Sequence, residues 1–318
     1  MAEEIDFTAI NTEPYNRNAS SADSDDVLVS VQNASFKWLS ADELVLRDIC
    51  MQCKRSELLT VIGRVGSGKS SLVSAILGEM IKCTGDVTVR GSIAYVAQQP
   101  WILNATLRDN ILFGSGYDQE FYEQVIDACA LRQDIDMLSA GDMTEIGERG
   151  INLSGGQKMR VSLARAVYAR ADIYILDDPL AAVDSHVSKH IFTHVLGPEG
   201  LLHSRARILV TNAVQYLNTA DNIVMLQDGK IVEQGSFKQV ASMQSKISKF
   251  INQHMDSPGS EKDNVTTLDA KNIDRSIGSI DNFNMPITEL PEVPDTNSVY
   301  DASSHEDRFM AQEEVANQ

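Results

Sequence analysis

The stretch GRVGSGKS (residues 63–70) fits the pattern GxxxxGK[ST]. It follows the apolar run ELLTVIG and opens KSSLVSAILGEM, which we expect to be a helix over residues 69–80. In this context the backbone N–H groups of a glycine-rich loop can surround phosphates, and the helix N-terminus favours their negative charge. Lys69 would then reach the outer phosphates, and the Ser70 hydroxyl would ligate Mg²⁺. The residues predicted to bind the nucleotide phosphates are Gly63, Arg64, Val65, Gly66, Ser67, Gly68, Lys69, Ser70 and Ser71.

Strand-like and helical segments alternate on both sides of this loop. Upstream, VLVSVQNASFKW and LVLRDICMQC are typical of strands. Downstream, GSIAYVAQ, ADIYILDD and ARILVTN are further predicted strands, residues 100–150 are mainly helical, and SGGQKMRVSLARAVYAR is a strong helix. NIVMLQDGKIVEQG predicts a hairpin that turns at Asp228-Gly229, and a last helix runs to about His254. The alternation favours an α/β fold with a mostly parallel sheet and helices on its faces.

The net charge of −18 belongs mainly to the two ends of the chain. Residues 1–26 hold seven acids and one base, and residues 256–318 hold fourteen acids and four bases. We therefore expect a disordered acidic arm over 1–26, a folded domain over 27–254 and a disordered acidic tail over 255–318. The folded part shows no strong basic stripe, so nucleic acid is not an expected partner. No run of about 18 apolar residues is present, so we expect no membrane-spanning segment.

Two short patterns could bind a metal but have simpler explanations. Cys50 and Cys53 form CxxC, yet no second CxxC or CxxH follows, and residues three apart on a strand point to opposite faces. His186 and His190 are spaced i, i+4 on a predicted helix, but no third ligand is evident, so a solvated helix face is the favoured interpretation. The cysteine pattern fits a reduced, intracellular chain.

Further motifs select one class among proteins that carry such a loop. YVAQQPW places Gln98 after a strand, LSGGQ (residues 153–157) precedes a helix, and ILDD ends in Asp177 and Asp178. AAVD follows and ends at Asp184, and the NKxD-like base reader of a GTPase is missing. In this order the motifs resemble the ATP-binding cassette (ABC) family over residues 27–254. The stretches GSIAYVAQQPWILNATLRDNILFG and HVLGPEGLL are similar to the first nucleotide-binding domain of multidrug-resistance-associated exporters, and especially to their fungal vacuolar members.

The resemblance implies a P-loop NTPase fold with a mostly parallel core sheet, an antiparallel β subdomain and an α-helical subdomain at about residues 100–155. It implies ATP and Mg²⁺ as ligands, with Trp38 stacked on adenine and with Ser70, Gln98 and Asp177 around the metal. Stacking of a base on an aromatic side chain contributes about 1–3 kcal/mol. Asp184 matches the position that contacts a second cassette. Phe113 matches the position at the membrane domains, and a buried core phenylalanine is the alternative.

Two positions depart from the pattern of active cassettes. Asp178 stands where they carry glutamate, and Asn212 stands where they carry histidine. The aspartate is one methylene shorter, and a general base must lie within about 2.6–3.2 Å of the proton that it removes. Asparagine can donate a hydrogen bond to phosphate but cannot carry the charge of an imidazolium. We therefore predict a site that binds ATP and cleaves it slowly, and a weak ATPase activity for this domain alone.

The signature LSGGQ is intact, so the resemblance implies that it completes the nucleotide site of a partner cassette. The residues concerned are Leu153, Ser154, Gly155, Gly156 and Gln157. The implied partners are a second nucleotide-binding domain and membrane-spanning domains, at the cytosolic face of a vacuolar or plasma membrane. Ser257, Ser260 and Ser304 resemble kinase sites in the tail. The alternatives are a free-standing soluble cassette ATPase and an ATP-gated regulatory module.

Overall fold

The computed structural model describes residues 26–39, 43–147, 152–241 and 245–255. The predicted acidic arm and tail, with the three candidate kinase sites, lie almost wholly outside these ranges. In the described part, β2, β1 and β4 form an antiparallel sheet, and six strands form a second sheet in the order β11-β10-β3-β9-β8-β5. The strands are β1 (Val27–Lys37), β2 (Leu46–Lys54), β3 (Leu58–Ile62), β4 (Ile81–Val89), β5 (Ile93–Val96), β8 (Ile173–Asp177), β9 (Ala206–Val210), β10 (Asn222–Gln227) and β11 (Lys230–Gly235).

The six-stranded sheet is parallel except for the β10–β11 hairpin, as the sequence predicts. Asp228 and Gly229 at the hairpin turn have φ angles of 51° and 73°, which is the left-handed conformation that this tight turn requires. All five residues of β3, of β8 and of β9 are buried. Their mainly apolar sequences follow from this, because strands covered on both faces need no polar alternation.

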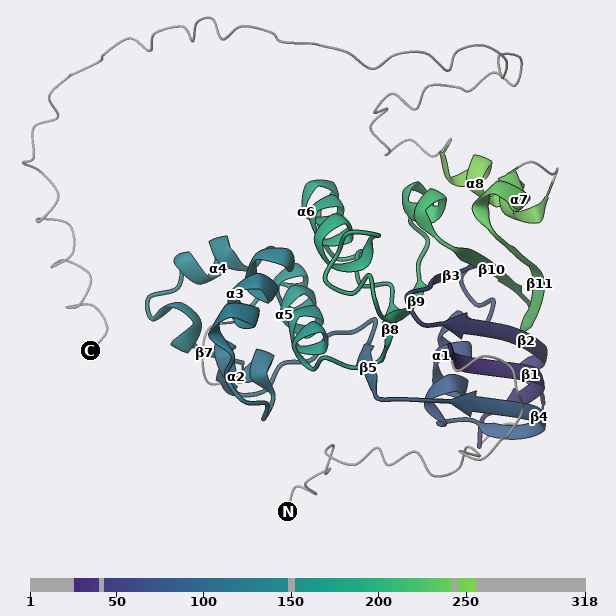
Figure 1. The fold of residues 1–318 in the computed structure, drawn as a ribbon, viewed down its shortest axis with the longest axis horizontal. Coiled ribbons are helices and arrows are strands. Elements are labelled where there is room, and N and C mark those ends of the chain that lie inside the picture. The colour runs from purple at the N-terminus through teal and green to yellow at the C-terminus, as the bar shows by residue number, and fades with distance from the viewer. Residues whose placement is uncertain (1–25, 40–42, 148–151, 242–244, 256–318) are drawn as a thin grey trace, which may run out of the picture. The chain divides into compact units, whose positions relative to one another are not determined.

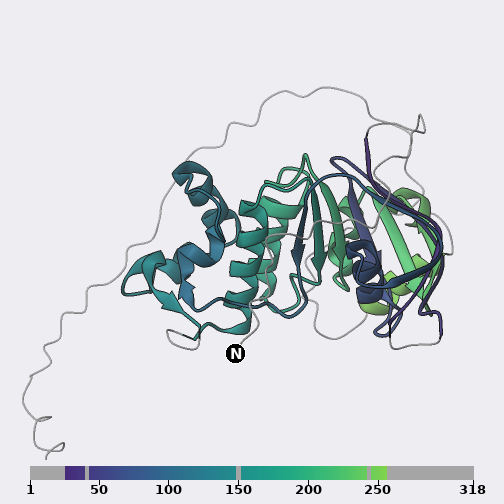
Figure 2. The same cartoon turned by 90° about the horizontal axis from the view of Figure 1, so that it is seen from below.

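Helices cover both faces of this sheet (Figure 1). On one face, α1 (Lys69–Leu77) packs between the two sheets, in a core that includes Leu72, Ile76 and Ile175. On the other face lie the helical elements between β5 and β9 (Figure 2). These are α2 (Leu107–Leu112), α3 (Gln119–Ala128), α4 (Arg132–Asp136), η1 (Gly141–Met143), α5 (Gly155–Tyr168), α6 (Ser185–Ile191) and η2 (Phe192–Leu196).

The C-terminal elements form a third, smaller core. They are η3 (Val214–Thr219), α7 (Phe237–Ala241) and α8 (Lys246–Met255), which pack with Ile62 and the adjacent face of β10. Residues 100–147 also hold a short two-stranded sheet, β6 (Ala105–Thr106) with β7 (Glu145–Ile146), so the predicted helical region is not helical throughout. Within the described ranges no helix has the length and apolar character that a membrane crossing requires.

One boundary and one strand differ from the sequence-based expectation. The helix expected over residues 69–80 ends at Leu77, because Gly78 adopts φ 86° and its N–H bonds back to the Ala75 and Ser74 carbonyls. Strand β4 was not predicted. Its first six residues are exposed, so it lacks the apolar alternation by which strands are recognised.

Candidate functional site

Four predicted motifs meet at one edge of the six-stranded sheet. The register pairs Val61 with Val210, and Asp177 with Val210 on its other side. Val96 pairs with Leu176, so the segments that hold Gly63, Gln98, Asp178 and Asn212 all leave the carboxyl ends of neighbouring parallel strands. Ligands of open α/β sheets bind outside this edge, so the fold brings these residues to the expected side.

The glycine-rich loop connects β3 to α1 and depends on its glycines. Gly63 has φ 154°, and a Cβ atom there would lie 2.4 Å from the Leu226 carbonyl oxygen and 2.6 Å from Ser67 Oγ. Gly66 has φ 81° with open space around it. The β10–β11 turn supports the loop from behind, since the Gly229 N–H donates to the Ser67 carbonyl at 3.0 Å. The loop is therefore held tightly on the sheet side and is open on the outside.

The side chains of Lys69 and Ser67 are suited to bind a phosphate group. Lys69 Nζ donates to the carbonyl oxygens of Gly63 at 2.7 Å and Arg64 at 3.0 Å, and no ion pair is found for it among the described residues. Burial lowers the pKa of Lys69, and the charges of Asp178 and Asp177 oppose that shift. Ser67 Oγ is buried and has no hydrogen-bond partner in the described part of the chain. An orphaned hydroxyl and an unpaired ammonium beside open N–H groups fit a bound polyphosphate.

The two acids after β8 occupy different environments. Asp177 is buried, and burial raises its pKa, while a hydrogen bond from Ser70 and the charge of Lys69 lower it. Asp178 is half-buried with φ 51°, and its Oδ1 accepts a hydrogen bond from Thr211 Oγ1 at 3.4 Å. Burial raises the pKa of Asp178 as well, with repulsion from Asp177 in the same direction. Thr211 was not predicted, although it follows β9 at the same edge as Asn212.

Gln98 and Asn212 are exposed, and the structure gives no hydrogen bond for either side chain within the described residues. Trp38 is half-buried and packs against the core between the two sheets. Trp38 follows the end of β1, and this end lies near the loop, because Phe36 pairs with Leu46 and Leu46 Cδ2 lies 3.2 Å from a Cβ built on Gly68.

The signature residues form the N-terminus of α5. Ser154 is the N-cap: its Oγ accepts from the Gln157 N–H at 3.2 Å, and Gln157 Oε1 accepts from the Ser154 N–H at 2.8 Å. This reciprocal capping box leaves the exposed Gly155 at the helix tip, where the first N–H groups have no partner within the helix. Leu153 is buried. No hydrogen bond or ion pair between described residues joins 153–157 to the loop at 63–71, so the two motifs do not form one site within this chain.

Asp184 and Phe113 both lie on the surface. Asp184 caps α6, and its Oδ1 accepts from the Val187 N–H at 2.9 Å. Phe113 is 40% exposed, so the alternative of a buried core residue is wrong. It packs edge-on against Trp101, and the Arg165 guanidinium lies 3.9 Å from the Trp101 ring centroid and 5.4 Å from that of Phe113. Trp101 and Arg165 were not predicted as part of this surface.

The two possible metal patterns are explained by local structure. Cys50 is exposed and Cys53 is buried, so the CxxC thiols point to opposite faces of β2 as expected. His190 Nε2 bonds to the Asp127 carbonyl at 2.8 Å, and its ring stacks on His194. Among the described residues no three His, Cys, Asp or Glu side chains are placed to hold a metal ion. A magnesium ion at Ser70, Gln98 and Asp177 would thus rely on ligands from the nucleotide and water.

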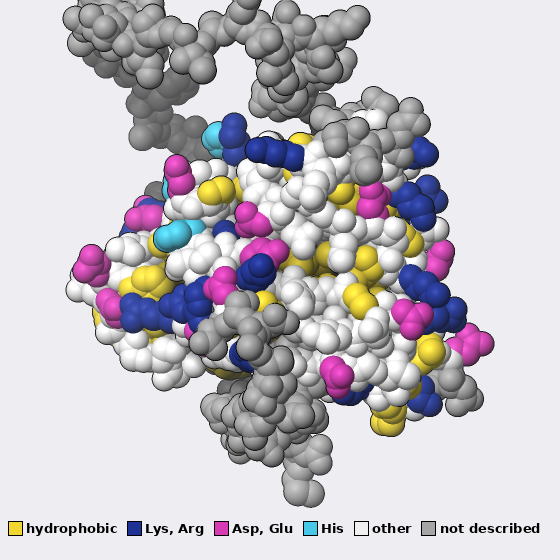
Figure 3. Space-filling view, turned by 45° about the vertical axis from the view of Figure 1, so that its right-hand side comes forward, with side chains coloured by type: hydrophobic (Ala, Val, Ile, Leu, Met, Phe, Trp, Pro, Cys, Tyr) yellow, Lys and Arg dark blue, Asp and Glu magenta, His cyan; other side chains and the backbone are white. Residues whose placement is uncertain are grey.

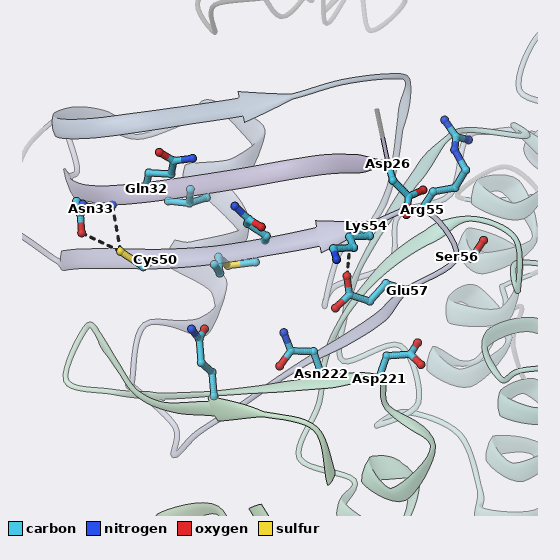
Figure 4. A pocket seen from close by; sticks show the side chains of 14 residues that line it. Asp26, Gln32, Asn33, Cys50, Lys54, Arg55, Ser56, Glu57, Asp221 and Asn222 are labelled. Carbon is cyan, nitrogen blue, oxygen red and sulfur yellow. Dashed lines mark hydrogen bonds between the residues drawn. The ribbon is translucent and has the colours of Figure 1, made fainter. Parts of the chain in front are cut away.

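A hollow lies at the opposite end of the sheet, near the start of β3 and β10. It has a volume of about 700 Å³ and is lined by residues that include Cys50, Glu57 and Asp221. Figure 4 shows its amide and charged side chains, with the Lys54 N–H donating to Glu57 Oε2 at 2.7 Å. On the face drawn in Figure 3, cationic and anionic side chains are interspersed. The residues that line the hollow do not include the loop at 63–70, where Val65 is 94% exposed.

Comparisons with known proteins agree with the motifs. Residues 46–181 match the family model described as "ABC transporter". The chain is 50% identical over 270 residues to mouse "ATP-binding cassette sub-family C member 2", which covers 85% of the chain and 17% of that protein. It is 52% identical over 229 residues to "Multidrug resistance protein mrp-7" of Caenorhabditis elegans, a match that covers 71% of the chain and 15% of that protein. It is 50% identical over 233 residues to "Metal resistance protein YCF1" of Saccharomyces cerevisiae, a match that covers 72% of the chain and 15% of that protein. The chain thus spans less than one fifth of the length of these relatives.

Proposed function

The chain belongs to the ABC transporter family, and on that premise we propose that residues 27–254 are an ATP-binding cassette of an exporter of the multidrug-resistance-associated type. The observation that carries the proposal is the meeting of the glycine-rich loop, Lys69 and the buried Asp177 at one sheet edge. MgATP would bind there, with its phosphates on the loop and its metal beside Ser70, Gln98 and Asp177. The half-buried Trp38 supplies the aromatic face for adenine.

We propose that this site hydrolyses ATP slowly. The carboxylate of Asp178 is half-buried and accepts a hydrogen bond from Thr211, so a short side chain is also tethered toward the sheet. Asn212 beside it is exposed and offers no imidazole. A short carboxylate that bonds to Thr211 is poorly suited to take a proton from a water molecule, which supports the interpretation of Asp178 as a degenerate base position.

The capped N-terminus of α5 supports the second half of the proposal. Its exposed tip makes no described hydrogen bond with the chain's own loop, so Ser154 to Gln157 would close over nucleotide held by a second cassette. Asp184 would contact that cassette, and the exposed Phe113 surface would meet the membrane domains. Binding of ATP would draw the two cassettes together, at the cytosolic face of the membrane, and this motion would drive transport.

The test is the steady-state ATPase rate of the purified chain with Asp178→Glu and Asn212→His together. General-base assistance contributes roughly 10²–10⁴-fold in rate, but it needs a closed pair of cassettes. We expect the rate per molecule to rise with protein concentration and to exceed that of the unsubstituted chain at least tenfold at the highest concentration.

Two added substitutions in that background serve as controls. Lys69→Ala removes the ammonium group that lies against the Gly63 and Arg64 carbonyls of the loop and should abolish both ATP binding and turnover. Lys54→Ala changes a lysine at the other end of the sheet and should leave both unchanged. A rate per molecule that is independent of concentration would argue against a shared site. An unchanged rate would show that Asp178 and Asn212 are not what limits hydrolysis.

A further inference from the structure

One acidic side chain outside every motif contacts the signature turn. Asp134 lies in α4, and its Oδ1 accepts a hydrogen bond from Gln157 Nε2 at 2.8 Å. Its other oxygen, Oδ2, accepts from Arg160 Nη2 at 2.6 Å. The side chains of Arg160 and Asp134 are only 12% and 11% exposed, so water competes little with this ion pair.

We propose that Asp134 is a positioning residue that fixes the signature turn in the geometry that completes the partner cassette's nucleotide site. The inference rests on the proposed function, and it assigns to α4 a role that none of the motifs carries. Asp134 touches no nucleotide in this arrangement, because it acts through Gln157 and Arg160.

The chemistry of the two side chains explains how the position is fixed. An amide has a donor end and an acceptor end, and it can turn by 180° at little intrinsic cost. An ionised aspartate only accepts hydrogen bonds, so it selects the orientation in which Gln157 Nε2 faces α4. Gln157 Oε1 is then directed to the Ser154 N–H at 2.8 Å, which completes the capping box. Asp134 therefore determines which end of Gln157 caps the helix.

Arg160, which lies one turn after Gln157 in α5, binds the same carboxylate of Asp134. The Arg160 Nε is buried and has no hydrogen-bond partner within the described residues. Within these residues, the charge-assisted hydrogen bond of Arg160 is formed by Nη2 with Asp134. Asp134 thus bonds to two successive turns of α5, and a shift of α4 would disturb both contacts at the signature end of that helix. A residue that merely stabilised the fold would not need both contacts at the functional end of the helix.

Asp142 provides a matched control in the same helical region. It forms a two-point ion pair with Arg108, at 2.8 Å to Nε and 3.0 Å to Nη2, and its side chain is 16% exposed. This pair makes no described contact with residues 153–157. Asp142→Asn therefore removes an ion pair whose acid is about as buried as Asp134, and it leaves the signature turn untouched.

The experiment uses mixed pairs of the full chain in the Asp178→Glu, Asn212→His background. One chain, the signature donor, also carries Lys69→Ala and so holds no nucleotide of its own. The other, the loop donor, also carries Ser154→Arg and so lacks a working signature. Each chain alone should be inactive, and their mixture should hydrolyse ATP at the single complete site.

We expect Asp134→Asn to act on one side of this pair only. Placed on the signature donor, it should lower kcat of the mixture at least tenfold and leave KM for ATP within twofold, because the loop that binds ATP belongs to the other chain. Placed on the loop donor, it should change kcat by less than twofold. Asp142→Asn should have less than a twofold effect on either chain.

A second variant removes the concern that Asp134→Asn leaves the Arg160 charge unpaired and so disturbs folding. Asp134→Asn together with Arg160→Gln leaves no unpaired charge and should melt close to the parent, yet it should show the same one-sided loss of kcat. Equal losses from both chains, or no loss with either variant, would overturn the positioning role. A mixture that is inactive even with Asp134 intact would instead overturn the shared site on which the proposal rests.

Discussion

At the scale of single residues, the candidate site depends on conformations that few residue types allow. Gly63 leaves β3 with φ 154° and lies against the Leu226 carbonyl, which lets the loop turn back over the strand end. Asp178 also has a positive φ, at 51°, which is tolerated better by aspartate than by most side chains. The same turn directs its carboxylate to Thr211, and so the backbone contributes to the predicted slow hydrolysis.

Gly63→Ala should lower the affinity for ATP at least tenfold. The added Cβ would lie 2.4 Å from a backbone oxygen that belongs to β10, so the loop must shift away from the strand. Gly114→Ala is the matched control, because Gly114 has φ 83° but no atom within 4 Å of the built Cβ. Titration with fluorescent ATP should show full affinity for Gly114→Ala, and equal affinities of the two variants would contradict the steric argument.

At the scale of elements, α5 links the surface aromatic residues to the core. Arg165 is buried, and burial lowers its pKa to about 10. It donates to the Asn110 carbonyl at 2.7 Å, to Asn110 Oδ1 at 3.0 Å and to the Trp101 carbonyl at 3.3 Å. The side chain therefore joins α5 to α2 and holds the segment on which Trp101 and Phe113 are exposed.

Arg165→Met should reduce the free energy of unfolding by about 2–4 kcal/mol, because three acceptors, two of them on the buried Asn110, lose a charged donor. Arg132→Met is the control: Arg132 pairs with Glu123 and Asp127 but is 42% exposed, and exposed pairs contribute about 0–1 kcal/mol. Urea unfolding of both variants measures the difference. A loss below about 1 kcal/mol for Arg165→Met would show that water replaces its hydrogen bonds.

The elements also show how far the sequence predicts the structure. The glycine-rich loop at 63–70, the acid pair and strands β8 and β9 were predicted, because a motif or a mainly apolar run marks each of them. Strand β4 was missed, since its exposed first half is recognised only by its pairing with β1. Asp134 and Thr211 act through contacts 23 and 33 residues away in the chain, and no local pattern indicates such contacts.

At the scale of the whole molecule, the described cassette and the acidic tail have different compositions. The cassette has three buried clusters. Residues 256–318 hold only three aromatic residues, so they bring little apolar surface to a core. The roles proposed for the cassette therefore require no residue beyond 255.

Removal of residues 256–318 should leave the melting temperature of the chain within about 2 °C. The deletion removes fourteen acids and four bases, which makes the net charge less negative and raises the isoelectric point. Calorimetry of the two chains at one ionic strength checks this. A drop of more than about 5 °C, which corresponds to roughly 1–2 kcal/mol for a domain of this size, would show that the tail contributes to the fold.

The close approach of Gly156 to the segment after the acid pair has a thermodynamic consequence. A Cβ atom at Gly156 would lie 2.9 Å from the Ala182 carbonyl oxygen, so the signature turn and the segment between Asp178 and Asp184 touch within one chain. In the proposed pair of cassettes, these two segments border different nucleotide sites. If binding of one nucleotide shifts this contact, the binding free energy at the other site changes, and this coupling is reciprocal. Occupancy of this chain's own site would then change the affinity of the site that its signature completes, and the pair would bind its two nucleotides cooperatively.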